Sequence, residues 1–192
     1  HGVVRCALGW ACWKTYVGRP ERDVLRRAAI SVLGNGLFSA DHHEDALSVR
    51  EAELSMKRRL GVSEDSILVA QNNLANTYAK LGRLDEALSM SRDVYSGRLK
   101  LLGEEHPQTL LAANNLADIL LALKRFEEAK ALLRKMVPVA QRVRGDSNED
   151  TLRMRWIYAA ALFYDPGAML DDVREAVTCL LYTSDAADEL CR

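Results

Sequence analysis

The sequence of 192 residues predicts an all-α fold in which antiparallel helix pairs stack into a solenoid, and three observations support this. First, three similar phrases, KRRLG, LKLLG and QRVRG, end at Gly61, Gly103 and Gly145, a spacing of 42 residues. Second, Gln71–Leu88 aligns without gaps with Ala113–Lys130. Third, apolar residues recur at helical period inside each unit. One helix pair is too small to bury its own apolar stripe, so successive pairs must share a core.

The composition excludes several functional classes. With 26 basic and 27 acidic residues the formal net charge is −1, so no global field attracts nucleic acid or an acidic membrane surface. The longest apolar run, Trp156–Tyr164, is far shorter than the ~20 residues that span a bilayer. We therefore expect neither a nucleic-acid partner nor a membrane partner. Cys6 and Cys12 form no C-x-x-C motif, which favours reduced thiols and a cytoplasmic location.

The two ends of the sequence differ from the middle. Residues 1–17 begin at His1 and lack the pattern of a signal peptide, so we interpret them as the end of a truncated preceding repeat. Residues 179–192 begin with CLLYTSDAADE, which resembles one translated frame of a sequencing-library adapter. We interpret them as a non-native tail, and the alternative is a natural helix end. The length then represents a window on a longer solenoid.

Between these ends the elements follow in order. Residues 18–61 form a degenerate first repeat, in which LGNGLF (Leu33–Phe38) stands where LANTY stands in the next unit. Residues 62–103 form the second repeat, whose first helix carries an apolar stripe and whose turn is Gly82-Arg83. Small residues at Ala87 and its counterpart Ala129 let paired helices approach closely.

The last two units repeat this plan. Residues 104–145 form the third repeat, with Lys124-Arg125 at the turn, so this turn does not strictly need glycine. Pro138 falls late in its second helix and should kink it. Residues 146–178 form a truncated fourth repeat, in which Trp156-Ile157 replaces the Asn pair of the earlier units and Asp165-Pro166-Gly167 predicts a turn.

The phrase LGEEHPQTLLAANNLADILLALKRFEEA (Leu102–Ala129), together with the period of 42, resembles the kinesin light chain type of tetratricopeptide repeat. The resemblance covers roughly residues 18–178. It implies a tetratricopeptide-repeat α-solenoid, wound as a right-handed superhelix, whose concave face binds a peptide segment or partner protein. Because many proteins unrelated to motors carry the same unit, it does not imply a motor subunit.

The resemblance also implies which residues bind. In the family, the first helix of each pair lines the groove and its Asn residues contact the peptide backbone. An Asn amide suits this task because it donates and accepts hydrogen bonds at once. The matching positions are Asn72, Asn73, Asn76 and Lys80 in one unit, and Asn114, Asn115 and Asp118 in the next. Val69 and Leu111 should lie beside them, with Leu121 completing the second set. Alternatively, one Asn of each pair holds the helix end of the adjacent repeat.

No motif predicts catalysis, a cofactor or a metal. The run Asp41–Asp45 (DHHED) falls on a turn and lacks metal-ligand spacing, and Gly34-Asn35-Gly36 lacks the Lys of a phosphate loop. His106 should pack or cap at a helix start. We expect a non-catalytic interaction module, which could enter a larger complex through parts missing from this fragment. The alternatives are a regulatory repeat segment of a larger enzyme or signalling ATPase, and a solenoid interior without a ligand of its own.

Overall fold

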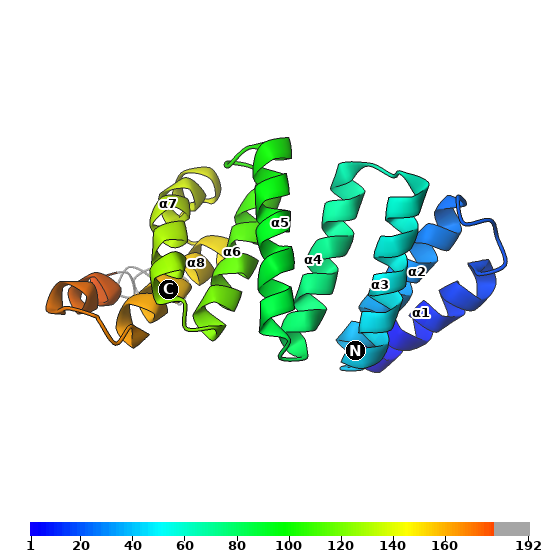
Figure 1. Cartoon of the computed structure of the whole chain (residues 1–192), viewed down its shortest axis with the longest axis horizontal. Coiled ribbons are helices and arrows are strands. Elements are labelled where there is room, and N and C mark those ends of the chain that lie inside the picture. The colour runs from blue at the N-terminus through cyan, green and yellow to red at the C-terminus, as the bar shows by residue number, and fades with distance from the viewer. Residues whose placement is uncertain (179–192) are drawn as a thin grey trace, which may run out of the picture. The chain divides into compact units, whose positions relative to one another are not determined.

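The computed structural model describes residues 1–178, and helices dominate this range (Figure 1). No strand occurs in the described residues. The helices are α1 (Gly2–Tyr16), α2 (Val24–Ser39), α3 (His43–Leu60), α4 (Glu64–Lys80), α5 (Leu84–Leu102), α6 (Pro107–Ala122), α7 (Phe126–Arg144) and α8 (Glu149–Tyr164). A further helical segment covers residues 170–178, which we call the terminal helix. The predicted all-α architecture is confirmed. The interpretation of residues 179–192 as an adapter-derived tail lies outside the described residues.

The chain forms two compact units, residues 1–90 and residues from Ser91 onward, and α5 crosses the boundary between them. In the first unit, α1 packs along α2, α2 packs on α3, and α3 packs on α4. Its core has two apolar clusters, one made of Leu33, Leu37 and Ala46, the other of Leu47, Leu54, Ala70 and Leu74. None of the helices in residues 1–178 combines the length and apolar character that a bilayer-spanning segment needs.

The second unit packs α7 against both α6 and α8, while α6 also contacts α8 directly. Its core is one apolar cluster, whose most deeply buried large side chains are Leu110, Leu133, Met136, Met154, Ile157 and Leu162. Each of these helices contributes at least one of these side chains, so the apolar stripes expected from helical periodicity face one another here. Helix α7 continues through Pro138 to Arg144.

Helix boundaries follow the local sequence. Asp23, Ser63, His106 and Asn148 each cap the start of a helix by accepting a hydrogen bond from a backbone N–H two or three residues on. The capping role predicted for His106 is therefore confirmed, with a distance of 3.2 Å from the Gln108 N to its Nδ1.

Each turn between paired helices needs one residue with a left-handed backbone conformation, in which φ is positive. Gly82 adopts this conformation with a φ of 75°. Asp41 and Lys124 stand at the matching turns with φ of 60° and 57°, so the turn does form without glycine, as predicted. At the start of each second helix, Ala46, Ala87 and Ala129 are completely buried, as expected for small side chains between paired helices.

A close contact between α1 and α2 was not foreseen from the sequence. Helix α1 packs on α2 through glycines from both helices, and a Cβ added at these positions would collide with backbone. A Cβ on Gly36 would lie 2.5 Å from the carbonyl oxygen of Arg5, and one on Gly9 would lie 2.9 Å from the Cα of Leu33. These glycines therefore set the distance between the two helices.

We predict that Gly36→Ala destabilises the first unit. Alanine gains ~1 kcal/mol in helix propensity over glycine, but the collision is with backbone, which cannot rotate away. Overpacking costs about 1–3 kcal/mol, and a collision with backbone belongs in the upper part of this range, at about 2–3 kcal/mol. After the gain in helix propensity we expect a net loss of about 1–2 kcal/mol in urea unfolding followed by circular dichroism.

The matched control is Gly18→Ala, because a Cβ there meets nothing within 4 Å. Its unfolding midpoint should stay at or above that of the wild type. Equal stability of the Gly36 variant and the wild type would contradict the packing assigned to α1 and α2.

Candidate functional site

The candidate site is the exposed face of the first helix of each pair, which we call the first-helix face. The first unit has such a face on α2 and α4, and the second unit has its own on α6 and α8. Apolar side chains lie exposed on it, with 42% of Val32, 39% of Val69 and 42% of Leu111 accessible to solvent. Val69 and Leu111 are thus accessible to a ligand, as a place beside the predicted binding residues requires. Such side chains, alternating with amides, can contact an extended chain.

In the first unit, two Asn residues occupy matching positions on this face. Asn35 on α2 is exposed, and Asn76 on α4 is half-buried. They match because LGNGLF in the first repeat aligns with LANTY in the second. Lys80 lies four residues beyond Asn76 and is exposed. Sequence analysis missed Asn35, although the same alignment contained it.

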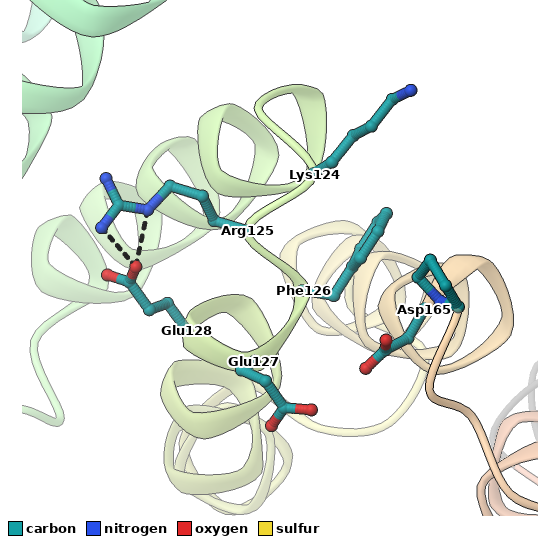
Figure 2. A pocket seen from close by; sticks show the side chains of 7 residues that line it. Lys124, Arg125, Phe126, Glu127, Glu128 and Asp165 are labelled. Carbon is teal, nitrogen blue, oxygen red and sulfur yellow. Dashed lines mark hydrogen bonds and ion pairs between the residues drawn. The ribbon is translucent and has the colours of Figure 1, made fainter.

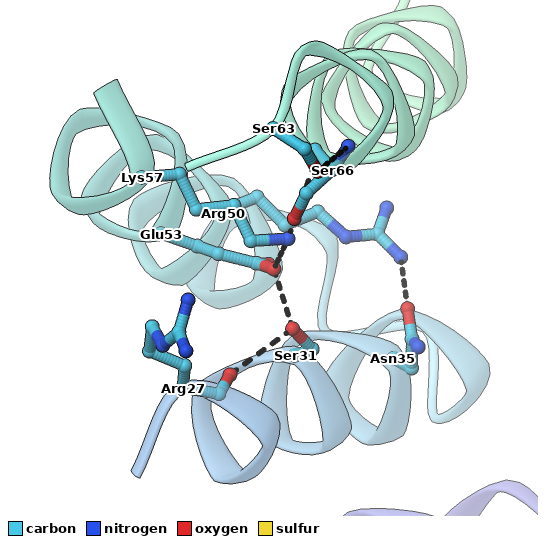
Figure 3. Close-up of polar contacts among 8 residues, drawn as sticks. All are labelled: Arg27, Ser31, Asn35, Arg50, Glu53, Lys57, Ser63 and Ser66. Carbon is cyan, nitrogen blue, oxygen red and sulfur yellow. Dashed lines mark hydrogen bonds and ion pairs between the residues drawn. The ribbon is translucent and has the colours of Figure 1, made fainter. Parts of the chain in front are cut away.

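A buried arginine lies beneath this pair and was also missed. Arg50 on α3 is only 4% exposed. Its Nη2 donates to Asn35 Oδ1 at 3.1 Å, and its Nη1 donates to the Asn73 carbonyl at 2.7 Å and to Thr77 Oγ1 (Figure 3 shows the contact with Asn35). The guanidinium also lies 4.5 Å from the ring centroid of Phe38. One side chain therefore connects α2, α3 and α4.

This network fixes how Asn35 is presented. Because its Oδ1 accepts from Arg50, its Nδ2 group remains to donate to a ligand. Burial lowers the pKa of Arg50 to about 10, against the attraction of Glu53, so the guanidinium stays charged at neutral pH. Asn73 contributes its backbone carbonyl to the network, and its side chain is half-buried, as is that of Asn72.

A second polar group lies next to Arg50 (Figure 3). Lys57 Nζ lies 2.8 Å from Glu53 Oε1, and both side chains are almost completely buried. Ser31 on α2 donates to the same carboxylate, and Lys57 also donates to the Ser66 carbonyl at the start of α4. When Ala46 of α3 is aligned with Ala129 of α7, three buried charged residues of α3 have apolar counterparts in α7. Arg50, Glu53 and Lys57 match Leu133, Met136 and Ala140, respectively. The first unit therefore uses hydrogen-bonded charges where the second uses apolar packing.

In the second unit the structure corrects one expectation. Asn114 is fully buried, so it does not lie exposed in a groove. Its Nδ2 donates to the backbone carbonyl of Asp150 at 3.0 Å, at the start of α8. It takes the alternative role, holding the helix end of the adjacent repeat. The physical reason is that α8 packs on α6 and covers this side of it. Asn115, one residue on, is half-buried.

Asp118 is already engaged by the neighbouring helix. It forms an ion pair with Arg153 on α8, whose side chain is 52% exposed. Burial raises the pKa of Asp118, and the attraction of Arg153 opposes this shift. A ligand at Asp118 would therefore meet a carboxylate that is already paired, with the exposed Leu111 two turns earlier on α6.

A cavity of about 400 Å³ lies at the turn between α6 and α7 (Figure 2). It is lined by Lys124, Arg125, Phe126, Glu127, Glu128, Asp165 and Pro166. Its charges pair with one another, since Arg125 binds Glu128 while Lys130 Nζ lies 2.6 Å from both Glu127 and Asp165. The hydrogen bond from Lys130 lowers the pKa of Asp165. We assign these contacts to holding α7 against the turn that follows α8.

The run at residues 41–45 is also structural. Asp41 lies on the turn before α3, and the ring of His43 packs on Phe38 with centroids 5.0 Å apart. The described residues include no group of three or more His, Cys, Asp or Glu side chains that could hold a metal ion.

These features define an all-α protein of packed helix pairs, which is the fold of tetratricopeptide-repeat solenoids, and the comparisons agree with this fold. Residues 66–142 match the family model described as tetratricopeptide repeat, in agreement with the predicted repeat type over this part of the chain. A search of curated proteins finds no match.

Solved structures extend the likeness to the whole chain. Two are crystal structures of a Podosopora anserina protein described as a candidate kinesin light chain with nearly identical TPR-like repeats. One of them is a point variant with a TM-score of 0.78, and the other has a TM-score of 0.76. Both are 21% identical in sequence to this chain, and each alignment covers 100% of this chain and 87% of the chain in the solved structure. BtubC (BKLC) from P. vanneervenii has a TM-score of 0.64 at 18% identity, covering 97% of this chain and 91% of its own. The predicted likeness to kinesin light chain-type repeats is therefore confirmed at the level of the fold.

We predict that Arg50→Met destabilises the first unit by about 3 kcal/mol, because Thr77 and the Asn73 carbonyl lose a charged donor inside the protein. The control is Arg92→Met, which removes an exposed pair with Glu128 and should cost less than about 1 kcal/mol. Urea unfolding measures both. Similar losses in the two variants would contradict the role of Arg50.

A second prediction concerns Asn114. Asn114→Ala leaves the Asp150 carbonyl without its donor and should lower the stability of the second unit by about 1 kcal/mol. Asn76→Ala, the same change at a half-buried position, should leave thermal unfolding nearly unchanged. The reverse order of effects would show that the two asparagines have been assigned the wrong roles.

Proposed function

We propose that this chain is a non-catalytic interaction module whose first-helix face binds an extended peptide segment of a partner protein. The observation that carries the proposal is the pair Asn35 and Asn76, at matching positions on neighbouring first helices, with the Asn35 amide oriented by buried Arg50. A held amide loses little side-chain entropy on binding, and its Nδ2 group suits the carbonyl acceptors of a peptide backbone.

The neighbouring side chains give the ligand its expected character. Val32 and Val69 offer apolar contacts beside the amides, and Lys80 supplies a positive charge at the end of α4. Asn72 and Asn73 stay in the proposed site of the first unit. In the second unit Asn115 and Asp118 stay as proposed binding residues, and Asn114, which is buried, is left out. We expect an extended ligand with an apolar side chain beside one Asn and a hydrogen-bonding backbone beside the other.

The wider setting follows from the same proposal. Tetratricopeptide repeats and structural neighbours described as kinesin light chains favour a module that recruits a protein into a larger assembly. The near-zero net charge favours a protein partner over nucleic acid or a membrane surface. Cys6 and Cys12 are both free thiols, which agrees with a cytoplasmic location.

The test is a screen of random peptides displayed on phage against the full chain, followed by titration of the selected peptides. The double variant Asn35→Ala with Asn76→Ala should bind a selected peptide about tenfold or more weakly, because two hydrogen bonds are lost. Its thermal unfolding should stay close to that of the wild type.

The control is Ser48→Ala, a polar-to-alanine change at an exposed position on α3, away from the first-helix face. It should bind the same peptides as the wild type does. The proposal is wrong if no peptide binds saturably, or if the double variant binds every selected peptide with unchanged affinity.

A further inference from the structure

The first unit contains a cavity of about 420 Å³ that the proposed peptide binding does not use. It lies where the turn between α3 and α4 meets the start of α2, because residues from these places line it. Arg22 precedes α2 and Arg27 lies near its start, while Ser63 and Ser66 lie at the start of α4. Residues 60–62 complete the lining. A volume in this range is typical of small-molecule sites in proteins.

Basic residues concentrate in two segments that adjoin the lining residues in sequence. Residues 19–27 and 57–59 together contain seven basic side chains and two acidic ones, although the whole chain has a net charge of −1. Three of the basic side chains already have acidic partners: Arg19 pairs with Asp23, Arg59 with Glu21, and Lys57 with Glu53. A local excess of positive charge therefore remains after these pairs have formed.

Arg27 brings an unsatisfied donor to this cavity. Its side chain is half-buried, and its Nε is shielded from solvent without a hydrogen-bond partner. Arg26 also buries its Nε, but its Nη1 donates to the Arg19 carbonyl. Within residues 1–178, neither Arg27 nor Arg22 has a partner for its guanidinium group. Because a buried donor without an acceptor is unfavourable, a bound anion would relieve this position.

The start of α4 adds further donors, and Figure 3 shows its two serines together with Arg27 on α2. Ser63 Oγ accepts from the Ser66 N at 3.4 Å, which leaves its own O–H to donate. The start of an α-helix also carries partial positive charge. Glu64 and Asp65 follow on this turn, but neither lines the cavity, and Asp65 has an interaction of its own. Among the described residues, the lining therefore combines positive charge with donors and includes no acidic side chain.

This set of donors matches a phosphate monoester better than a carboxylate. A guanidinium group binds two oxygens of either anion at once. One arginine can occupy both oxygens of a carboxylate, whereas a phosphate monoester has three terminal oxygens and a larger negative charge at neutral pH. Two arginines and two hydroxyls together therefore suit the phosphate, and Leu60 and Val62 offer apolar contacts to the carbon atoms that carry it.

We propose that this cavity is a binding site for a phosphate monoester, held by Arg22 and Arg27 together with Ser63 and Ser66. The phosphate is carried by a phosphorylated side chain of a partner protein or by a small phosphorylated compound, since both present the same group. The site uses none of the Asn residues of the first-helix face. It therefore goes beyond the proposed peptide binding and does not depend on it.

The test titrates three compounds into the ¹⁵N-labelled full chain at constant ionic strength. They are a short peptide with one phosphoserine and no other charge, the same peptide without the phosphate, and inorganic phosphate. NMR follows the backbone amides of Ser63 and Ser66, which should shift saturably with the phosphoserine peptide and not with the unphosphorylated one. Tighter binding of the phosphoserine peptide than of inorganic phosphate would identify a partner protein as the source. Binding of the peptide no tighter than that of inorganic phosphate would identify small phosphorylated compounds.

Two variants and a matched control locate the binding. Arg22→Gln and Arg27→Gln each remove one guanidinium and should weaken binding of the phosphoserine peptide at least tenfold, because charge-assisted hydrogen bonds are lost. Since Arg27 loses no partner, its variant should unfold at or above the wild-type temperature. Arg83→Gln removes the same charge from an exposed pair with Glu86 in the first unit and should bind as the wild type does.

The proposal fails if neither the phosphoserine peptide nor inorganic phosphate shifts the two serine amides saturably. It also fails if Arg83→Gln weakens binding as much as Arg27→Gln does, because this would indicate general attraction to a basic surface. Unchanged binding by both Arg22→Gln and Arg27→Gln would show that the anion does not bind in this cavity. None of these outcomes bears on the Asn35 and Asn76 variants, so the two proposals can fail separately.

Discussion

A pair of antiparallel helices cannot bury its own apolar stripe, and the rest of this structure depends on that constraint. Each pair must be covered by its neighbour, so some side chains of a first helix face the next pair while others stay exposed. Ala46, Ala87 and Ala129 are completely buried where paired helices come closest. Asn114 shows the same constraint acting on a polar residue, because the next first helix covers it and its amide holds the Asp150 carbonyl.

The two units meet this constraint with different chemistry. In the second unit the side chains at the positions that match Arg50, Glu53 and Lys57 are apolar, and Leu133, Met136 and Ala140 belong to the apolar cluster there. In the first unit Arg50, Glu53 and Lys57 are buried together, and their desolvation is offset by partners on α2 and α4. Such contacts hold only in one geometry, because a displaced helix leaves a buried charge without its partner. They therefore position Asn35 more strictly than apolar packing would, which suits a residue proposed to bind a ligand.

The repeat period was enough to predict the helices, their turns and the small residues between them, because each follows from spacing alone. The site was harder to predict. Asn114 and Asn115 are adjacent, and a difference of one position turns a side chain by about 100° around the helix, between the covered and the exposed side. Asn35 was missed because the internal register of the first repeat slips against that of the others. Arg50 was missed because a charge on a helix is usually solvated, and only tertiary contacts show that this one is buried.

The same constraint explains why the exposed apolar residues lie where they do. Helix α1 uses its glycine side against α2, and no later helix in the described chain covers its other side. The terminal helix buries Ala176 and leaves Leu170, Val173 and Val177 outward. Both helices therefore keep an apolar face of the kind that a neighbouring helix covers in a stack of helix pairs.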